Sequence, residues 1–333
     1  MRDFQDYRIT YYVAVFVALL TLPGCHFRST GPLAFVTNER DGTVTVIDTQ
    51  SDRVVSTLEI GGRVRGIRVG ADKTFWVAIS YPTNERQGED KIAHVNKDGV
   101  VLAKYEAGTD PENFVLDKTE KHLYIANEDA GTASVTDVDS NHVTKVMSVG
   151  LEPEGAAISP DGHWVYITSE SSSSVSVIDT QTQQVVKTFL VGARPREAVF
   201  AADGRRAYVT AENGNTVAVV DVARHEVIKS IDLPRVDGPG QLKPKGISVS
   251  SDGKRIYVAT GRGNSVAVID GDSLRLITLI PVGQRPWGLS LSLDGKKLYT
   301  ANGISNDVSV IDTGSNRVVT TIKAGDGPWG IAL

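Results

Sequence analysis

Two sets of residues in this sequence have types and spacing that could bind a ligand. The first, here called the rim residues, has members that are mostly 42 residues apart: Arg65, Glu112, Glu154, Arg196, Lys245, Trp287 and Trp329. The second, here called the exit residues, has similar spacing: Glu39, Ser80, Glu128, Glu170, Glu212, Gly261 and Gly303. Carboxylate, guanidinium and indole groups together predict a site for a polar ligand with a flat apolar part, held by charge-assisted hydrogen bonds and stacking.

Two other interpretations of the same residues remain open. The charged rim residues could form only a solvated ion-pair network, with Trp287 and Trp329 covering the apolar ends of their strands. The acidic residues could instead hold a hard cation such as calcium. The chain has no Asp-rich spacing of the EF-hand type, so no metal ligand is assigned, and a divalent cation stays open as the only cofactor.

Catalytic motifs are absent from the sequence, so no catalytic residue is predicted and enzymatic activity is left open. The histidines fall outside both sets: His26, His94, His122, His142, His163 and His225. Ser171–Ser174 is a polar loop without a Gly-x-Ser-x-Gly motif, and no Cys-x-x-Cys-His haem motif occurs. These absences favour a binding protein over an enzyme.

An internal repeat must position the two sets. Tyr124, Tyr166 and Tyr208 are each 42 residues apart, as are Tyr257 and Tyr299. A polar residue closes one strand of each repeat, and seven such residues occur: Asp48, Asn96, Asp137, Asp179, Asp221, Asp270 and Asp312. Four short alternating strands per repeat are typical of a propeller blade. The sequence therefore predicts an all-β, seven-bladed β-propeller with four-stranded blades.

The two ends of the repeat array predict how the ring closes. The first repeat starts at Phe35–Thr37 without an inner strand, whereas the last repeat is followed by the spare segment 330–333. We expect Trp329–Leu333 to pair with the N-terminal blade, because that pairing removes an open sheet edge. The propeller would span residues 33–333. Two insertions, Tyr81–Lys91 and Asp237–Lys243, are predicted to be loops, either functional or merely tolerated.

The N-terminus has the features of an export signal. Tyr11–Leu20 is an apolar stretch, and Leu22–Cys25 resembles the bacterial lipoprotein box, which predicts a signal peptide over 1–24, a lipidated Cys25 and a tether over 25–32. Cys25 is the only cysteine, so no disulfide forms within the chain. We expect a periplasmic or cell-surface protein held to the membrane by lipid alone, with inner and outer membrane both open. The net charge of −5 makes nucleic acid an unlikely partner.

Several segments resemble the YVTN-repeat propellers. Phe35–Asn38 and Tyr208–Ala211 match the segment that names the family, and Leu123–Asp129, Asn302–Asp312 and Gly327–Gly330 resemble the exported PQQ-dependent catabolism-associated β-propeller proteins. The resemblance implies an accessory role in periplasmic alcohol oxidation, with a quinoprotein dehydrogenase or a transporter component as partner. It carries over no catalytic residues.

The sequence therefore predicts a lipid-anchored, exported binding or scaffolding propeller that serves a quinoprotein oxidation system. The alternative is a cation-dependent hydrolase of the propeller-lactonase type.

The lipid anchor gives the first testable prediction. Replacing Cys25 with serine should release the protein in soluble form, because stable attachment needs the acyl chains that only the cysteine can receive. Cell fractionation and mass spectrometry of the mature N-terminus measure this. An unmodified Cys25 in the membrane fraction would contradict the prediction.

Overall fold

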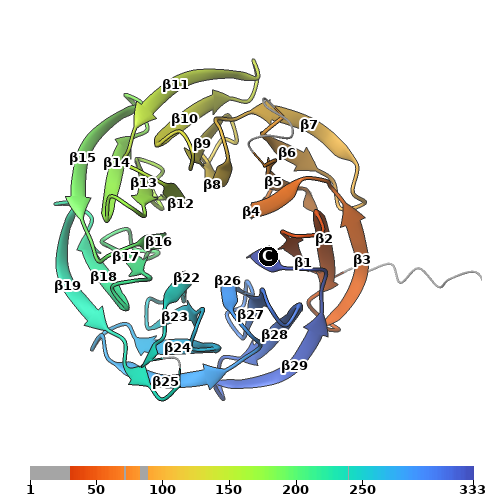
Figure 1. Cartoon of the computed structure of the whole chain (residues 1–333), viewed down its shortest axis with the longest axis vertical. Helices are drawn as coiled ribbons and strands as arrows, with labels where there is room; N and C mark the ends of the chain where they lie inside the picture. The colour runs from red at the N-terminus through yellow and green to blue at the C-terminus, as the bar shows by residue number, and fades with distance from the viewer. Residues whose placement is uncertain (1–30, 71–72, 83–88, 239) are drawn as a thin grey trace, which may run out of the picture.

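The computed structural model describes residues 31–70, 73–82, 89–238 and 240–333. These residues form seven four-stranded antiparallel sheets and one short hairpin, arranged as a closed ring (Figure 1). The predicted seven-bladed propeller is confirmed. The predicted signal peptide, Cys25 and nearly all of the tether lie outside the described residues, as do residues 83–88 of the first insertion.

Each blade consists of an inner, a second, a third and an outer strand. The inner strands are β4 (Arg63–Val69), β8 (Pro111–Leu116), β12 (Pro153–Ile158), β16 (Pro195–Phe200), β22 (Pro244–Val249), β26 (Pro286–Leu291) and β30 (Pro328–Ala332). The second strands are β1 (Leu33–Asn38), β5 (Phe75–Ser80), β9 (His122–Asn127), β13 (Trp164–Ser169), β17 (Arg206–Ala211), β23 (Arg255–Thr260) and β27 (Lys297–Asn302).

The third strands are β2 (Thr43–Asp48), β6 (Lys91–Val95), β10 (Thr132–Asp137), β14 (Ser174–Asp179), β18 (Thr216–Asp221), β24 (Ser265–Asp270) and β28 (Asp307–Asp312). The outer strands are β3 (Arg53–Glu59), β7 (Val101–Glu106), β11 (His142–Ser148), β15 (Gln184–Leu190), β19 (Glu226–Asp232), β25 (Leu276–Pro281) and β29 (Arg317–Lys323). The second insertion carries the hairpin of β20 (Arg235–Val236) and β21 (Gly240–Gln241).

The core lies between blades, because each sheet packs both of its faces against neighbours. In β14 every residue except the last is buried, whereas in the outer strand β15 buried and exposed residues mix. The repeated tyrosines of the second strands are buried in these interfaces, including Tyr166 and Tyr299 at 0% exposure. Hydrophobic residues of two adjacent blades therefore form each core cluster.

The repeated aspartates have a structural role in the turn after each third strand. Oδ1 of Asp179 accepts a hydrogen bond of 2.9 Å from the backbone N–H of Thr182, and Oδ1 of Asp312 accepts one of 2.7 Å from Ser315. Asn96 acts in the same way, accepting one of 2.9 Å from Val100. A short polar side chain that bonds its own backbone favours this turn.

Ring closure occurs as the sequence predicts. Strand β30 pairs antiparallel with β1, with Val36 opposite Ile331 and Phe35 opposite Ala332. The sheet order β3-β2-β1-β30 makes β30 the inner strand of the first blade. The blade of β26–β29 is also linked to this first blade by Tyr299, whose hydroxyl donates a hydrogen bond of 2.7 Å to Oδ1 of Asp52.

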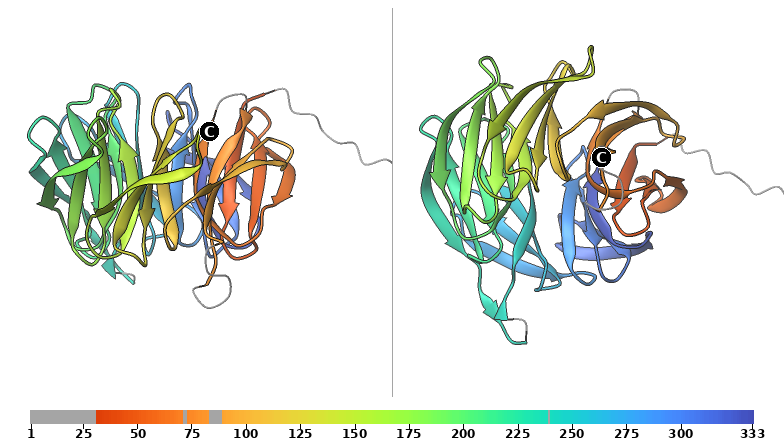
Figure 2. Two further views of the ribbon diagram at one scale, coloured as in Figure 1. Left: turned by 90° about the horizontal axis from the view of Figure 1, so that it is seen from above. Right: turned by 45° about the horizontal axis from the view of Figure 1, so that its top comes forward.

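Strand direction places the functional candidates at one end of the ring. Every inner strand starts at the end where every second strand finishes, and the hairpin β20–β21 lies in a connection at that same end. The C-terminus is at the opposite end of the short cylinder (Figure 2). In the described part of the chain no helix is long and apolar enough to cross a membrane.

Deleting Trp329–Leu333 should destabilise the whole ring. The deletion removes ladder hydrogen bonds worth about 1 kcal/mol each and the burial of Ile331, worth roughly 2 kcal/mol. Thermal unfolding should show a fall of many degrees, whereas Val319→Ala on the exposed side of β29 should change little. Equal melting temperatures for the truncated and full-length proteins would refute closure by β30.

Candidate functional site

All seven rim residues lie at the start of an inner strand, at equivalent positions around the ring axis. The five charged ones are buried, with exposed fractions of 3–8%. The interpretation of the charged rim residues as a solvated ion-pair network therefore needs correction. The ion-pair network exists, but it is buried inside the protein. Only Trp287 and Trp329 are partly exposed, and their rings stack with centroids 5.9 Å apart.

Arg65 is the centre of one cluster of acidic residues. Its Nε lies 3.0 Å from Oε1 of Glu39, and its Nη1 lies 3.3 Å from Oδ1 of Asp110 and 3.6 Å from Oε2 of Glu128. Nη1 also contacts the carboxylate of Glu112. Burial raises the pKa of Glu128 to about 7, and nearby carboxylates add to this effect. Asp110 is a member that the sequence did not single out.

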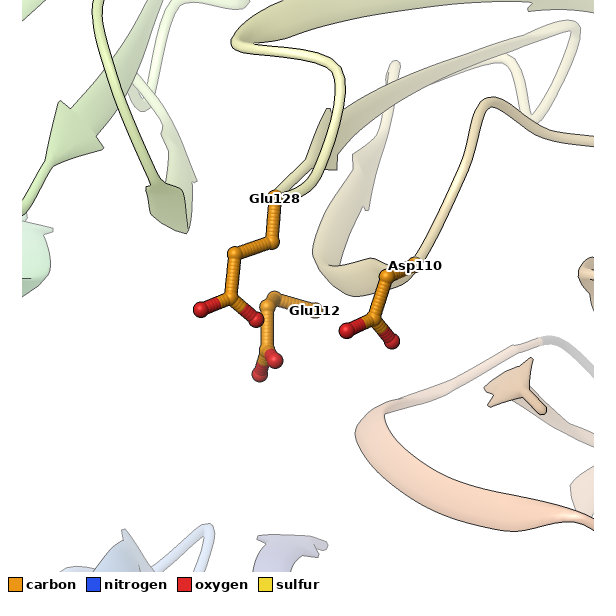
Figure 3. A group of neighbouring side chains, drawn as sticks. All are labelled: Asp110, Glu112 and Glu128. Atoms are coloured by element: carbon orange, nitrogen blue, oxygen red, sulfur yellow. The ribbon is translucent and has the colours of Figure 1, made fainter. Parts of the chain in front are cut away.

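The same carboxylates are the group within the described residues that could ligate a metal ion. Oxygen atoms of Asp110, Glu112 and Glu128 lie within 4.8 Å of one another and point toward the ring axis (Figure 3). However, Nη1 of Arg65 already sits against all three, and the Arg65 side chain is only 6% exposed. A cation would have to displace this buried guanidinium, so the cluster does not fit a divalent ion.

Arg196 is the centre of a second cluster on the other side of the axis. Its Nη1 lies 2.7 Å from Oε1 of Glu154 and contacts Glu170, and its Nε lies 2.6 Å from Oε2 of Glu212. Arg194 adds a second guanidinium, 2.7 Å from Oε2 of Glu170. Charged groups buried in this way persist only when they are paired, which this arrangement achieves.

The carboxylates around Arg196 differ in their proton affinity. Burial raises the pKa of Glu170 to about 8, and the charge of Glu154 adds to this effect. Burial alone would raise the pKa of Glu212, but the charges of Arg196 and Lys245 lower it to about 2. Glu154 and Glu170 share Nη1 of Arg196, and burial together with the repulsion between the two carboxylates favours the protonated form of Glu170.

Lys245 joins the second cluster to the tryptophans. Its Nζ lies 3.2 Å from Oε2 of Glu212 and 3.6 Å from the ring centroid of Trp287. The guanidinium groups of Arg196 and Arg285 lie 5.3 and 5.2 Å from the same ring. Cations over an indole face are attracted to its electron density. Trp287 therefore belongs to the charged site rather than only covering the end of its blade.

A pocket opens between these groups on the ring axis. The pocket is narrow: about 30 Å³ is free for the centre of a water molecule, out of about 320 Å³ of empty space when the open mouth is included. Residues from six inner strands line it. Rim residues contribute Glu154, Arg196, Lys245, Trp287 and Trp329. The pocket thus brings together the basic and aromatic rim residues with one carboxylate, whereas Arg65 and Glu112 do not line it.

The pocket also contains a carboxylate that the sequence did not single out, Glu197. Burial raises its pKa above the ordinary glutamate range, although the charge of Arg68 opposes the shift. Its Oε2 accepts a long hydrogen bond of 3.4 Å from the backbone N–H of Ile247. Glu197 therefore faces the axis as a carboxylate with increased proton affinity.

The repeats contain the signal that could have identified Glu197. The position after each rim residue is glycine in five repeats: Gly66, Gly155, Gly246, Gly288 and Gly330. A Cβ atom at Gly155 would lie 2.3 Å from the carbonyl oxygen of Arg196, and one at Gly246 would lie 2.4 Å from that of Trp287. Glu197 and Asn113 depart from this rule, and both line the pocket.

The remaining candidates lie outside the pocket. The exit residues Ser80, Gly261 and Gly303 are buried at or just after the ends of their second strands. Glu170 contacts Arg196 but does not line the pocket. The described histidines are on third strands or at the far end of the ring. For example, Nδ1 of His225 lies 2.7 Å from the hydroxyl of Tyr166. As expected from the sequence, none of them lines the axial pocket.

Comparison with known proteins adds a family match for part of the chain. The family model "Lactonase, 7-bladed beta-propeller" matches residues 180–322, which is less than half of the chain. A search of curated proteins finds no match.

Solved structures with the same fold are numerous. The periplasmic gluconolactonase of Pseudomonas aeruginosa is 20% identical with a TM-score of 0.74, over 90% of this chain and 98% of that one. A candidate 6-phosphogluconolactonase from Bacteroides fragilis is 18% identical with a TM-score of 0.73, over 91% and 99%. Kuenenia stuttgartiensis hydrazine synthase is 21% identical with a TM-score of 0.72, over 88% and 99%. At these identities the likeness shows the fold alone.

These findings correct the function predicted from the sequence. The chain was expected to be a binding or scaffolding accessory of a quinoprotein system. That prediction is wrong, because the matched family is one of lactonases and several structural neighbours are named as lactonases. The comparisons favour the alternative, a hydrolase of the propeller-lactonase type. The finer resemblance to YVTN-repeat and PQQ-associated propellers gains no support from them.

The Glu170 proton predicts a specific pH dependence of stability. The folded protein holds this proton up to a pKa of about 8, whereas an ordinary glutamate releases it near 4.5, so its stabilising contribution is full below pH 4.5 and lost by about pH 8. Glu170→Gln keeps a neutral side chain and should melt a few degrees above the wild type at pH 8–9, with little difference at pH 4.5.

Thermal unfolding across this pH range provides the measurement. Glu226→Gln, which changes an exposed carboxylate on β19, is the matched control and should leave the pH dependence unaltered. If the melting temperatures of Glu170→Gln and the wild type changed with pH in parallel, Glu170 would be ionised in the folded protein over the whole pH range, and the prediction would be wrong.

Proposed function

We propose that this protein is a hydrolase of the propeller-lactonase type that opens a cyclic ester at the mouth of the axial pocket. The observation that carries the proposal is the convergence of Glu197 and Arg196 on that pocket. One is a carboxylate with a raised pKa, and the other is a guanidinium in contact with three carboxylates. The family match over residues 180–322, which include both, supports the reaction class.

Glu197 would act as the general base. A carboxylate with increased proton affinity is better suited to accept a proton from water than an ordinary one. Water attacks the acyl carbon as its proton passes to Glu197, and a new carbon–oxygen bond forms. The bond from the acyl carbon to the ring oxygen then breaks, and protonated Glu197 gives its proton to the leaving alkoxide. The product is the open-chain hydroxy acid.

Arg196 would stabilise the negative charge that develops on the carbonyl oxygen. Glu154, Glu170 and Glu212 contact its guanidinium through Nη1 and Nε, and the Arg196 side chain lines the pocket. The three carboxylates also fix the guanidinium before the substrate arrives. A donor that is already oriented lowers the barrier because no reorganisation is needed during the reaction.

No step in this mechanism passes through a metal ion. The acidic residues that could ligate one are occupied by Arg65, and they lie outside the pocket. The cation in the sequence-based alternative is therefore not part of the proposal. Metal analysis of the active, purified protein tests this point, and loss of activity on chelation would contradict it.

The proposal also includes the cellular setting that the N-terminus predicts. The lipoprotein box at Leu22–Cys25 supports an exported enzyme anchored to the membrane by lipid. Its substrate would then be a lactone outside the cytoplasm.

Replacing Glu197 with glutamine should reduce kcat/KM for lactone opening about 100-fold or more, since general-base catalysis contributes roughly 10²–10⁴-fold. The measurement is acid release in a pH-stat with glucono-δ-lactone and with dihydrocoumarin, after subtraction of spontaneous hydrolysis. Thermal unfolding checks that the variant folds.

The control for this experiment is Glu226→Gln, an isosteric change far from the axis, which should keep wild-type activity. Equal rates for Glu197→Gln and the wild type would exclude Glu197 as the base. An absence of hydrolysis of every lactone tested, with folded wild-type protein, would overturn the proposed function itself.

A further inference from the structure

Lys245 is a nucleophilic residue of the site, and the hydrolytic mechanism proposed above does not use it. The residue is 3% exposed, yet its side chain lines the axial pocket. Its Nζ is within ion-pair distance of Glu212, at 3.2 Å, but no acceptor among the described residues meets it in good hydrogen-bond geometry. Its other neighbour is the face of Trp287, 3.6 Å away, which accepts no ordinary hydrogen bond, so the amine is more available for reaction than a lysine whose three donors are satisfied.

Lys245 also lines a second pocket beside the axial one. This pocket lies between the blades of β22 and β26 and has about 730 Å³ of empty space with its mouth included. Arg262 and Arg285 form part of its wall, and both are exposed. Asn264 and Gln284 add amide groups, and Glu212 adds a carboxylate whose charge is paired with Arg196 at 2.6 Å. Two guanidinium groups at the mouth favour a ligand with a carboxylate, which they can bind through charge-assisted hydrogen bonds.

We propose that Lys245 is a carbonyl-reactive lysine that forms an imine with a small α-oxo acid bound in this second pocket. The free amine of Lys245 adds to the carbonyl carbon and forms a carbon–nitrogen bond. The resulting carbinolamine then loses one water molecule to give the imine, with no oxidant or reductant involved. Arg262 and Arg285 hold the carboxylate of the acid. This activity goes beyond lactone opening and does not depend on it.

The surroundings of Lys245 favour the free amine more than those of an ordinary lysine do. Burial and the charge of Arg196 together lower the pKa of Lys245 to about 8, although Glu212 and Glu154 oppose the shift. Arg285 faces the same Trp287 ring and adds another positive charge nearby. An ordinary lysine has a pKa of about 10.4, so at pH 8 its amine is almost entirely protonated.

Reductive trapping in the wild-type protein tests the proposal. The protein is incubated at pH 8 with glyoxylate and sodium cyanoborohydride, which converts an imine into a stable carboxymethyl amine. Peptide mass spectrometry then compares Lys245 with Lys243. Lys243 is an internal control, since it is partly exposed and its Nζ donates a hydrogen bond of 2.7 Å to Oδ1 of Asn213.

We expect at least ~10-fold more carboxymethyl label on Lys245 than on Lys243 at limiting reagent, because the fraction of free amine decides the rate of addition. Equal labelling, or label on Lys243 alone, would overturn the proposal. Because both lysines are in one molecule, this result does not depend on whether a variant folds. It is also independent of lactone hydrolysis, so failure of either proposal is recognised separately.

A double variant tests the recognition of the carboxylate. Arg262→Gln together with Arg285→Gln should reduce labelling of Lys245 by glyoxylate several-fold, while labelling by formaldehyde, which has no carboxylate, should stay the same. Unchanged labelling by glyoxylate would show that the two arginines do not bind the acid and would overturn the choice of α-oxo acids.

Discussion

The close approach of the seven inner strands is the constraint on which the rest of this structure depends. Around most of the ring, the residue after each rim residue faces the carbonyl oxygen of the next blade so closely that only glycine fits. A Cβ at Gly288 or Gly330 would lie 2.7 Å from that oxygen, and one at Gly66 would lie 2.8 Å from it. Such contacts fix the backbone of most rim residues relative to the neighbouring blade.

This constraint explains why the site is both charged and buried. The rim side chains start from fixed backbone around a narrow axis, so charges from different blades meet without much water between them. Arg65 and Arg196 each gather carboxylates from more than one blade, which offsets the cost of burying them. The same burial separates the proton affinities of neighbouring groups, as Glu170 and Glu212 show.

The arrangement divides the axis into two regions with different chemistry. The Arg65 cluster is closed, because acidic groups surround its guanidinium and the pocket does not reach it. The Arg196 cluster borders the pocket, where Glu197, Lys245 and Trp287 add a base, an amine and an aromatic face. The first region joins neighbouring blades, and the second contains the groups on which the proposed lactone opening rests.

The sequence predicts the fold well because propeller repeats are local. The 42-residue spacing of Tyr166 and Tyr208 and the turn aspartates such as Asp179 depend on neighbouring residues and on adjacent blades only. The rim residues were also predicted, since equivalent repeat positions must lie at equivalent places in a ring.

The electrostatics of the site could not be predicted in the same way. The charge of Arg68 on β4 acts on Glu197 on β16, which belongs to a blade across the axis, and sequence spacing does not reveal this relation. Burial of Arg196 depends likewise on how side chains from several blades meet. Glu197 itself could have been found, because it stands where other repeats have glycine.

The pH dependence of kcat/KM for lactone opening tests the central claim most directly, because it reports on the free enzyme's catalytic groups. The account predicts an acid limb in which activity falls as pH decreases through a pKa above the ordinary glutamate value of about 4.3. This limb should disappear in Glu197→Gln, whatever residual rate remains. A profile that is the same in the variant and the wild type would contradict the assignment of Glu197 as the base of the axial pocket.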